Sequence, residues 1–488
     1  AVSGTKKENM RVDSFYWVKG QEDFISLNKA KNIILEPLNY LKLIKGEKIQ
    51  KEYSLKDIRE LALEMHDSLR AIKVTEKHKP LFIAGILIAL QNEDFANDYS
   101  SFTSYNTVIN NLNLAIDSVL SEDDISKAKI NYVKNAFKTI GNNEKLKAIP
   151  LSHKNSIIWY IEQLEMNIKP MMLHAEVTID ALGVFYHEFV KYSGGDGAGL
   201  GIVLTPQHIT EFMCDLAKVN KNSKASFLVT AMSKMFKDAN PTEIDRIKRE
   251  GLYGVELDPD LFTLSIANMI VRKDGKSNIQ NGDCFSKKIK DDLKKKQINI
   301  GLINPPYSQK DICELEFVEN LLEILTPGGT GVAIVPMSCA IGTKFTDVRE
   351  RLFEKHTLKA VFSMPDDVFY PTSTNTCIMV WEAHTPHDSS QETFFGYCKD
   401  DGFVKRKKLG RIDAYDRWES IKKEWLNLYR NRDIKDGMSA RKSVTYLDEW
   451  LCEAYMKTDY TKLNEFDFEN TIKNYLAYLV KSGDSYEN

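Results

Sequence analysis

The chain has 488 residues, 43% of them hydrophobic and 28% charged, with a formal net charge of −3. This composition excludes a fibrous or disordered protein and predicts about two to four folded domains. The longest apolar run, 81–90, is too short to cross a bilayer, so we expect no membrane-spanning helix. A chain this close to neutrality needs a partner's help to hold a nucleic acid tightly.

Seven cysteines are scattered along the chain without a CxxC pair or a histidine-rich partner cluster. This spacing predicts reduced thiols in a cytoplasmic protein and no metal site. Four histidines fall in or beside helical segments without ligand-like spacing, which favours core or surface roles over catalysis: His153, His174, His187 and His208.

The N-terminal part of the chain divides into two segments. The chain opens without a methionine, and its first residues, Ala1 to Thr5, resemble the end of a strand. We therefore expect residues 1–45 to be the remnant of an upstream, nuclease-like domain. From Leu55 to Leu69, apolar residues recur at steps of three or four, and similar patterns follow. This periodicity predicts a helical domain over 46–192.

A glycine-rich linker at 193–199 marks the next boundary, because the pattern changes there to alternating strands and helices. The expected strands are short apolar runs: 251–257, 298–303, 331–335, 358–362 and 376–381. They predict an α/β domain with a doubly wound sheet over 193–400. Helical patterning then returns near Trp418, which predicts a C-terminal helical segment over 401–488.

The sequence Asn304-Pro305-Pro306-Tyr307 follows directly after the expected strand at 298–303. Open α/β sheets place their active loops at such strand ends. The side-chain oxygen of Asn304 and the backbone carbonyl of Pro305 could bind both hydrogens of an aromatic amine and free its lone pair for attack. The two prolines fix the loop, so these acceptors need not reorganise.

Tyr307 is suited to stack on a base, and a base inside a duplex must be turned out to reach such a loop. We therefore expect a second aromatic nearby, and Phe369 or its neighbour Tyr370 is the candidate. The alternative is that the two prolines only end a strand and Tyr307 is a surface residue of a turn.

Two acidic residues follow other expected strands. Glu256 is placed to bind the ribose of a nucleoside cofactor, and Asp283 to accept from its adenine amino group. Alternatively, each acid simply caps the helix after it. The cofactor interpretation is favoured by the order of four features along the chain: the two acids, then the Asn304 loop, then a strand after 327–329.

From about Tyr53 onward the chain resembles the amino-group DNA methyltransferases of restriction-modification systems, above all the modification subunits of type I systems and related fused enzymes. The family's catalytic motif matches Asn304, Pro305, Pro306 and Tyr307 in full, whereas Phe369 matches only by context. Glu256 and Asp283 match its acidic cofactor positions. The segment from Leu204 to His208 is similar to the part that touches the cofactor's methionine. The alternative for this segment is a helix start, with Thr205 as the cap and Pro206 as the first helical residue.

This resemblance implies Thr205, Pro206, Glu256, Asp283 and Asn304 as ligands of S-adenosylmethionine. It implies double-stranded DNA as substrate, a separate DNA-specificity subunit, a possible second copy of the chain and a nuclease domain or subunit. The expected setting is the cytoplasm of a bacterium or archaeon. The N-terminal 43 residues resemble the close of a nuclease domain but contain no cleavage motif.

One family feature is missing from the sequence. An acidic strand end followed by a glycine-rich loop should precede Glu256, yet no glycine occurs between Gly201 and Gly251. The chain passes from Lys224-Ala225 directly to a segment typical of the helix after that loop. Either the intact protein has this strand and loop in addition to the 488 residues, which we favour, or the protein cannot bind the cofactor normally.

A basic run follows the predicted catalytic domain, and it either contacts DNA phosphates or forms a solvated hairpin: Lys405, Arg406, Lys407 and Lys408. The lysine-rich segment 287–296 fits a solvated amphipathic helix.

The sequence thus predicts direct methyl transfer to the exocyclic amino group of an adenine turned out of DNA. Two alternatives remain: an acceptor amino group on cytosine, in RNA or on a protein glutamine, or an inactive scaffold that clamps DNA.

Overall fold

The computed structural model describes residues 2–3, 11–19, 23–26, 40–41, 44, 55–75, 78–122, 130–131, 134–135, 137–138, 141–169, 205–225, 228–271, 278–307, 309, 311–370, 374–406, 410–457 and 463–482. These residues form two compact units, one of 1–204 with 256–281 and the other of 205–255 with 282–488. No helix in the described ranges is both long and apolar enough to span a membrane.

The second unit is built on a six-stranded sheet of order β14-β11-β9-β10-β8-β7. Its strands are β7 (Ile300–Ile303), β8 (Thr330–Pro336), β9 (Thr357–Ser363), β10 (Thr376–Glu382), β11 (Glu392–Tyr397) and β14 (Ser439–Ser443). The β7–β8 and β9–β11 pairs are parallel, and β10 is antiparallel to both neighbours. Central strands are continuously apolar because both sheet faces are covered.

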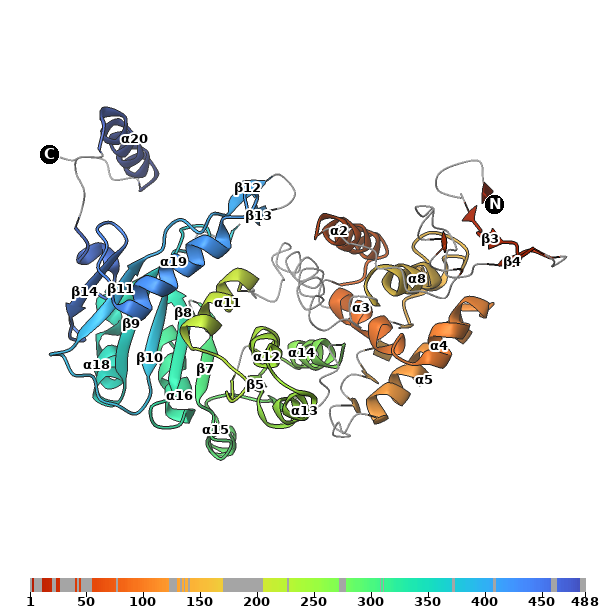
Figure 1. The fold of residues 1–488 in the computed structure, drawn as a ribbon, viewed down its shortest axis with the longest axis horizontal. Helices are drawn as coiled ribbons and strands as arrows, with labels where there is room; N and C mark the ends of the chain where they lie inside the picture. The colour runs from red at the N-terminus through yellow and green to blue at the C-terminus, as the bar shows by residue number, and fades with distance from the viewer. Residues whose placement is uncertain are drawn as a thin grey trace. The chain divides into compact units, whose positions relative to one another are not determined.

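Helices cover the two faces of this sheet (Figure 1). On one face lie α16 (Glu314–Ile324), α17 (Ser338–Ile341) and α18 (Thr346–Lys355); on the other, α11 (Gln207–Leu216) and α19 (Trp418–Asn431). Phe362 of β9 meets both Phe212 of α11 and Tyr429 of α19. The doubly wound α/β arrangement predicted from the sequence is confirmed.

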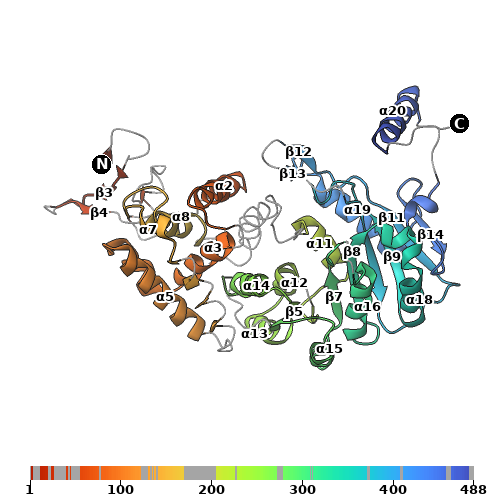
Figure 2. The same ribbon diagram turned by 180° about the vertical axis from the view of Figure 1, so that it is seen from behind.

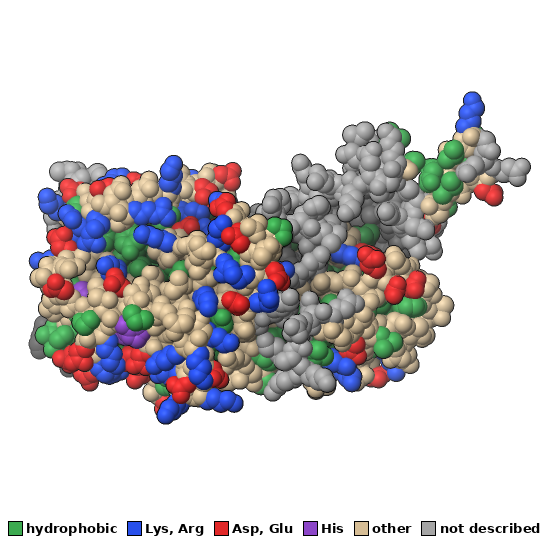
Figure 3. Space-filling view, turned by 60° about the horizontal axis from the view of Figure 1, so that its bottom comes forward, with side chains coloured by type: hydrophobic (Ala, Val, Ile, Leu, Met, Phe, Trp, Pro, Cys, Tyr) green, Lys and Arg blue, Asp and Glu red, His purple; other side chains and the backbone are tan. Residues whose placement is uncertain are grey.

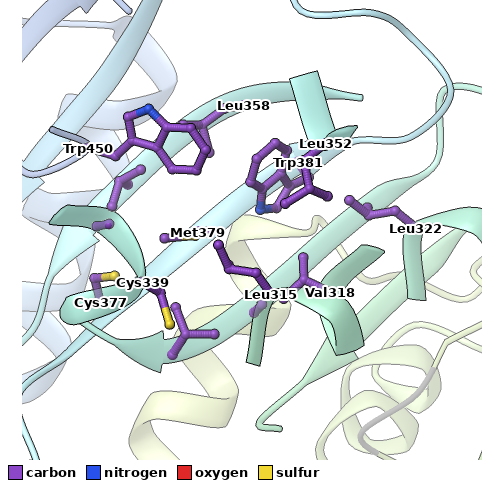
Figure 4. Packing of buried hydrophobic residues seen from close by; sticks show 14 of the residues in the cluster. Leu315, Val318, Leu322, Cys339, Leu352, Leu358, Cys377, Met379, Trp381 and Trp450 are labelled. Carbon is purple, nitrogen blue, oxygen red and sulfur yellow. The ribbon is translucent and has the colours of Figure 1, made fainter. Parts of the chain in front are cut away.

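The core under α16 and α18 is a continuous apolar cluster (Figure 4). Trp381 and Trp450 are fully buried in it, and Phe353 stacks on Trp450 with ring centroids 4.8 Å apart. Residues on α16 recur at the helical period, with Leu315, Val318 and Leu322 all buried. This core fixes the sheet that carries β7.

The other elements of the second unit are shorter. They are α12 (Leu228–Phe236), α13 (Pro241–Glu250), α15 (Lys287–Lys294), β12 (Val404–Arg406), β13 (Gly410–Ile412), α20 (Glu465–Ser482) and most of β5 (Tyr253–Glu256). Asn240 begins α13 with a capping box closed by Glu243. Ile289 and Leu293 are the buried side of α15, which confirms the amphipathic helix predicted at 287–296.

The first unit is helical, as predicted from its periodicity. It contains α2 (Leu55–Ala71), α3 (His78–Ala89), α4 (Glu93–Asp98), η3 (Tyr99–Ser101), α5 (Tyr105–Glu122), α7 (Glu144–Lys147), α8 (Ile157–Asn167) and α14 (Pro259–Val271), with β6 (Asn278–Asn281). The apolar α3 is buried along its length and packs on α14 (Figure 1 and Figure 2). Four two-residue strands precede them: β1 (Val2–Ser3), β2 (Arg11–Val12), β3 (Phe15–Tyr16) and β4 (Ile25–Ser26).

The C-terminal part contains the helices α19 and α20 of the predicted helical segment and, in addition, a strand of the main sheet. Strand β14, after α19, joins the main sheet beside β11. Its sequence, SARKS, has no apolar alternation because it is an edge strand, held by backbone pairing. The predicted linker at 193–199 lies outside the described residues.

Candidate amino-group-binding site

The Asn304 loop begins where parallel strand β7 ends, opposite Ala333 of β8. Gly301 lets α16 approach the strand, since a Cβ there would lie 2.8 Å from Leu321 Cγ. The Asn304 Nδ2 donates a hydrogen bond to Thr205 Oγ1 at 3.0 Å. This bond joins two predicted site residues that are 99 positions apart in the chain.

The start of α11 differs from the expected helix start. Pro206 is the N-cap rather than the first helical residue, and α11 begins at Gln207. Thr205 was the expected cap, but its hydroxyl instead accepts the bond from Asn304. The helix therefore begins without a side-chain cap, and Thr205 is tied to the loop after β7.

Tyr307 is held on two sides. Its hydroxyl donates to the Ile334 carbonyl of β8 at 3.4 Å, and its ring meets Phe369 edge-to-face, with centroids 6.1 Å apart at 83°. Burial raises the pKa of Tyr307 above its ordinary value, so the phenol stays neutral. Phe369 is 3% exposed whereas Tyr370 is 47% exposed. Of the two candidates, Phe369 is the one packed against Tyr307.

The two predicted acidic ligands make local hydrogen bonds within their own units. In the first unit, Glu256 Oε1 accepts from Asp258 N at 2.9 Å, and burial is the main cause of its raised pKa. In the second unit, Asp283 Oδ1 accepts from Phe285 N at 2.9 Å. Neither acid caps the following helix directly, because Asp258 bonds to Leu261 N in α14 and Ser286 is the N-cap residue of α15.

The basic run forms a hairpin of β12 and β13. Lys405 Nζ lies 3.1 Å from Asp367 Oδ2, and Arg406 donates to the Tyr415 hydroxyl at 3.2 Å. Lys407 and Lys408 lie outside the described residues. The two described basic side chains therefore already have partners on the protein.

A buried ionic cluster joins this hairpin to α11, and no pattern in the sequence indicated it. Arg411 donates two hydrogen bonds to Asp401, at 3.0 and 2.7 Å, and its Nε lies 3.0 Å from Asp367 Oδ1. His208 Nε2 lies 3.0 Å from Asp401 Oδ2, the oxygen that also accepts from Arg411, and the His208 ring stacks on Phe403 with centroids 3.8 Å apart. Asp401 is 1% exposed.

Charges in this cluster are set by burial and pairing. Burial lowers the pKa of His208, and its bond to Asp401 opposes this without overcoming it, so the imidazole is neutral. Burial alone would raise the pKa of Asp401, but bonds from His208 and Arg411 outweigh it and the pKa is lowered. Since Asp367 lies two residues before Phe369, the cluster fixes the turn that carries this aromatic.

The residues of the second unit fit a methyl-donor nucleoside only in part. Thr205 and Asn304 offer a hydroxyl and an amide oxygen at the end of β7. Where a further strand and its loop were expected, Ala225 makes a single-residue bridge to Leu252 and to Ile300. In the described residues, that strand position holds only this bridge residue and its neighbour Lys224.

Comparison with known proteins supports the fold and defines the family. A chain of a type I restriction-modification system, solved in work on complex assembly and conformational transition, superposes with a TM-score of 0.59 at 16% identity, covering 90% of this chain and 100% of that chain. The methyltransferase subunit of a type I system from Streptococcus thermophilus gives 0.59 at 14% identity, covering 83% and 100%.

Sequence relatives point to the same group. The Type II restriction enzyme and methyltransferase RM.BcgI of Heyndrickxia coagulans is 32% identical over 479 residues, covering 92% of this chain and 74% of the relative. The Type I restriction enzyme StySPI methylase subunit of Salmonella potsdam is 26% identical over 176 residues, 32% of each chain.

The sheet and the helices on both of its faces define an α/β protein with a Rossmann-like domain. The model of the N-6 DNA Methylase family matches residues 177–315 and 310–478, and the chain belongs to this family.

Proposed function

We propose that this chain is the modification module of a restriction-modification enzyme and that its Asn304 loop binds the exocyclic amino group of an adenine turned out of DNA. The family's reaction transfers a methyl group to that nitrogen, and S-adenosylmethionine is the donor that the family implies. The observation that carries the proposal is the Asn304-Pro305-Pro306-Tyr307 loop at the end of β7, with Tyr307 packed against Phe369.

The chemistry of the loop supports an amino acceptor. The Nδ2 of Asn304 is engaged by Thr205, which orients the amide so that its oxygen can accept from a substrate amine. Pro305 contributes a carbonyl on a backbone with fixed φ. A neutral, partly buried Tyr307 offers a ring face rather than a charge. Two acceptors and an aromatic face match a flat heterocycle that carries an amine.

DNA affinity in this proposal comes from an assembly. Lysine and arginine side chains are interspersed with acidic ones on the face seen in Figure 3, and the formal charge is −3. We propose a separate specificity subunit that reads the sequence, with a second copy of the chain in the same complex, in the cytoplasm of a bacterium or archaeon. A nuclease domain or subunit completes the assembly.

The test compares single-stranded oligonucleotides that differ in one functional group, at low salt and without cofactor. Adenine-containing strands are measured against strands that carry purine, which lacks the amino group, and against cytosine-containing strands. Fluorescence anisotropy gives the affinity of the full chain, of Asn304→Ala and of Asn431→Ala, an exposed control at the end of α19.

We expect adenine to be preferred over purine by about 5- to 30-fold, the value of one or two hydrogen bonds. Asn304→Ala should remove this preference, whereas Asn431→Ala should keep it. A preference for cytosine would support the alternative acceptor. Equal affinity for all three strands would leave a DNA-clamping scaffold as the better function.

A further inference from the structure

The strand position between β5 and β7 is occupied by one residue. Ala225 forms parallel bridges to Leu252 and to Ile300. Its N–H donates to Gly251 O at 2.8 Å, and its carbonyl accepts from Tyr253 N at 3.0 Å. On the other side, Ile300 N donates to Lys224 O at 3.1 Å. Lys224 and Ala225 therefore lie in the sheet between the two strands.

This strand stops short of the level at which the Asn304 loop begins. Ala225 is opposite Ile300, the first residue of β7, and β7 continues to Ile303. A strand there needs three more residues, about 10 Å of rise, to reach the carboxyl end of β7. Only two residues separate Ala225 from α12, which begins at Leu228. The strand alone needs three residues, so two residues cannot complete it and also supply the turn into the helix.

The missing part is the one that a nucleoside cofactor needs in an open α/β sheet. Ligands of this class bind outside the carboxyl ends of the strands, where a turn into a helix brings backbone N–H groups close to the ligand. Such an approach requires glycine, because a Cβ would occupy the space. The sequence has no glycine from Ile202 to Glu250.

The acceptor side of the site is nevertheless built. Asn304 is bonded to Thr205, and Tyr307 is packed between Ile334 and Phe369. The bridges at Ala225 also keep β5 and β7 in place without the full strand. The chain thus has a base-binding loop beside a strand that is too short to hold a methyl donor.

Of the two alternatives that the sequence left, the bridges from Ala225 to both neighbouring strands favour the second. We infer that this chain binds its target base but has lost the methyl-donor half of the site, so that by itself it does not hold S-adenosylmethionine. The inference rests on the proposed function in one respect only, namely that the bound base is adenine. It makes the chain an adenine-binding module of a modification assembly, and methyl transfer requires the strand and loop that the sequence lacks after Ala225.

The test is calorimetric titration of S-adenosylmethionine into the full chain and into two insertion variants. The first variant receives, between Ala225 and Ser226, a designed insert of three further strand residues followed by a glycine-rich loop. The second receives the same insert with its glycines changed to alanine. Binding of adenine-containing strands, measured as above, verifies that each variant is folded.

We expect no saturable heat from the chain or from the alanine insert, and binding at least about 100-fold tighter from the glycine insert. Binding by the unaltered chain within about tenfold of the glycine insert would overturn the inference. If none of the three proteins bound S-adenosylmethionine, the lack of binding could not be assigned to the missing strand and loop after Ala225, and the inference would fail. The proposed function fails separately, through loss of the adenine preference, because that measurement uses no cofactor.

Discussion

Removing Arg411 should destabilise the second unit far more than removing a surface arginine from the same region. In Arg411→Ala, the carboxylate of Asp401, 1% exposed, loses two charged hydrogen bonds at 3.0 and 2.7 Å and keeps its contact with His208 and the bond from Phe403 N. An uncompensated buried charge costs about 3–5 kcal/mol of unfolding free energy. The ion pair of Arg411 with Asp367 is lost as well.

Arg417→Ala is the matched control. Arg417 pairs with Asp400, the neighbour of Asp401, at 2.9 Å, but the two side chains are 50% and 69% exposed. Such pairs contribute about 0–1 kcal/mol. Urea unfolding followed by tryptophan fluorescence is the assay, because the ring of Trp418 lies 5.0 Å from that of His208. A loss below about 1 kcal/mol for Arg411→Ala, or equal losses for both variants, would refute this reasoning.

The same variant should act on the base-binding site. Arg411 contacts Asp367, and Phe369, two residues later, packs against Tyr307. We expect Arg411→Ala to weaken the adenine-over-purine preference at temperatures where the unit remains folded, and Arg417→Ala to leave it unchanged. An unaltered preference in Arg411→Ala would mean that the turn holds Phe369 without the ionic cluster.

Three further outcomes follow from the fold. Gly301→Ala should cost about 1–3 kcal/mol in urea unfolding, since the new Cβ would meet Leu321 at 2.8 Å; a neutral effect would show that α16 shifts freely. Trp450→Ala should cost about 3–5 kcal/mol by the same assay, as a fully buried ring is removed. Burial lowers the pKa of His356 from 6.5 to about 4, so protonation favours the unfolded chain and stability falls as the pH drops from 6.5 towards 4, by up to about 3 kcal/mol. His356→Gln should flatten this pH dependence, and an unchanged profile would assign it to other groups.

The sequence was sufficient for features that depend on local pattern. Continuous apolar runs predicted β8, β9 and β10 because both faces of these central strands are buried. The position of Asn304 at a strand end was predicted from the apolar run before it. Helix α2 was predicted from the helical spacing of its apolar residues. The absence of glycine near Ala225 was also visible in the sequence.

Tertiary structure decided the features that depend on partners far along the chain. The polar strand β14 exists because β11 supplies its backbone partner, and no side-chain pattern records that pairing. His208 and Asp401 are 193 residues apart, so their contact has no local signature. The sequence placed Thr205 at a helix start, but only the fold brought its hydroxyl to Asn304. Periodicity reports which side of an element is buried, whereas hydrogen bonds and ion pairs depend on which distant element lies against it.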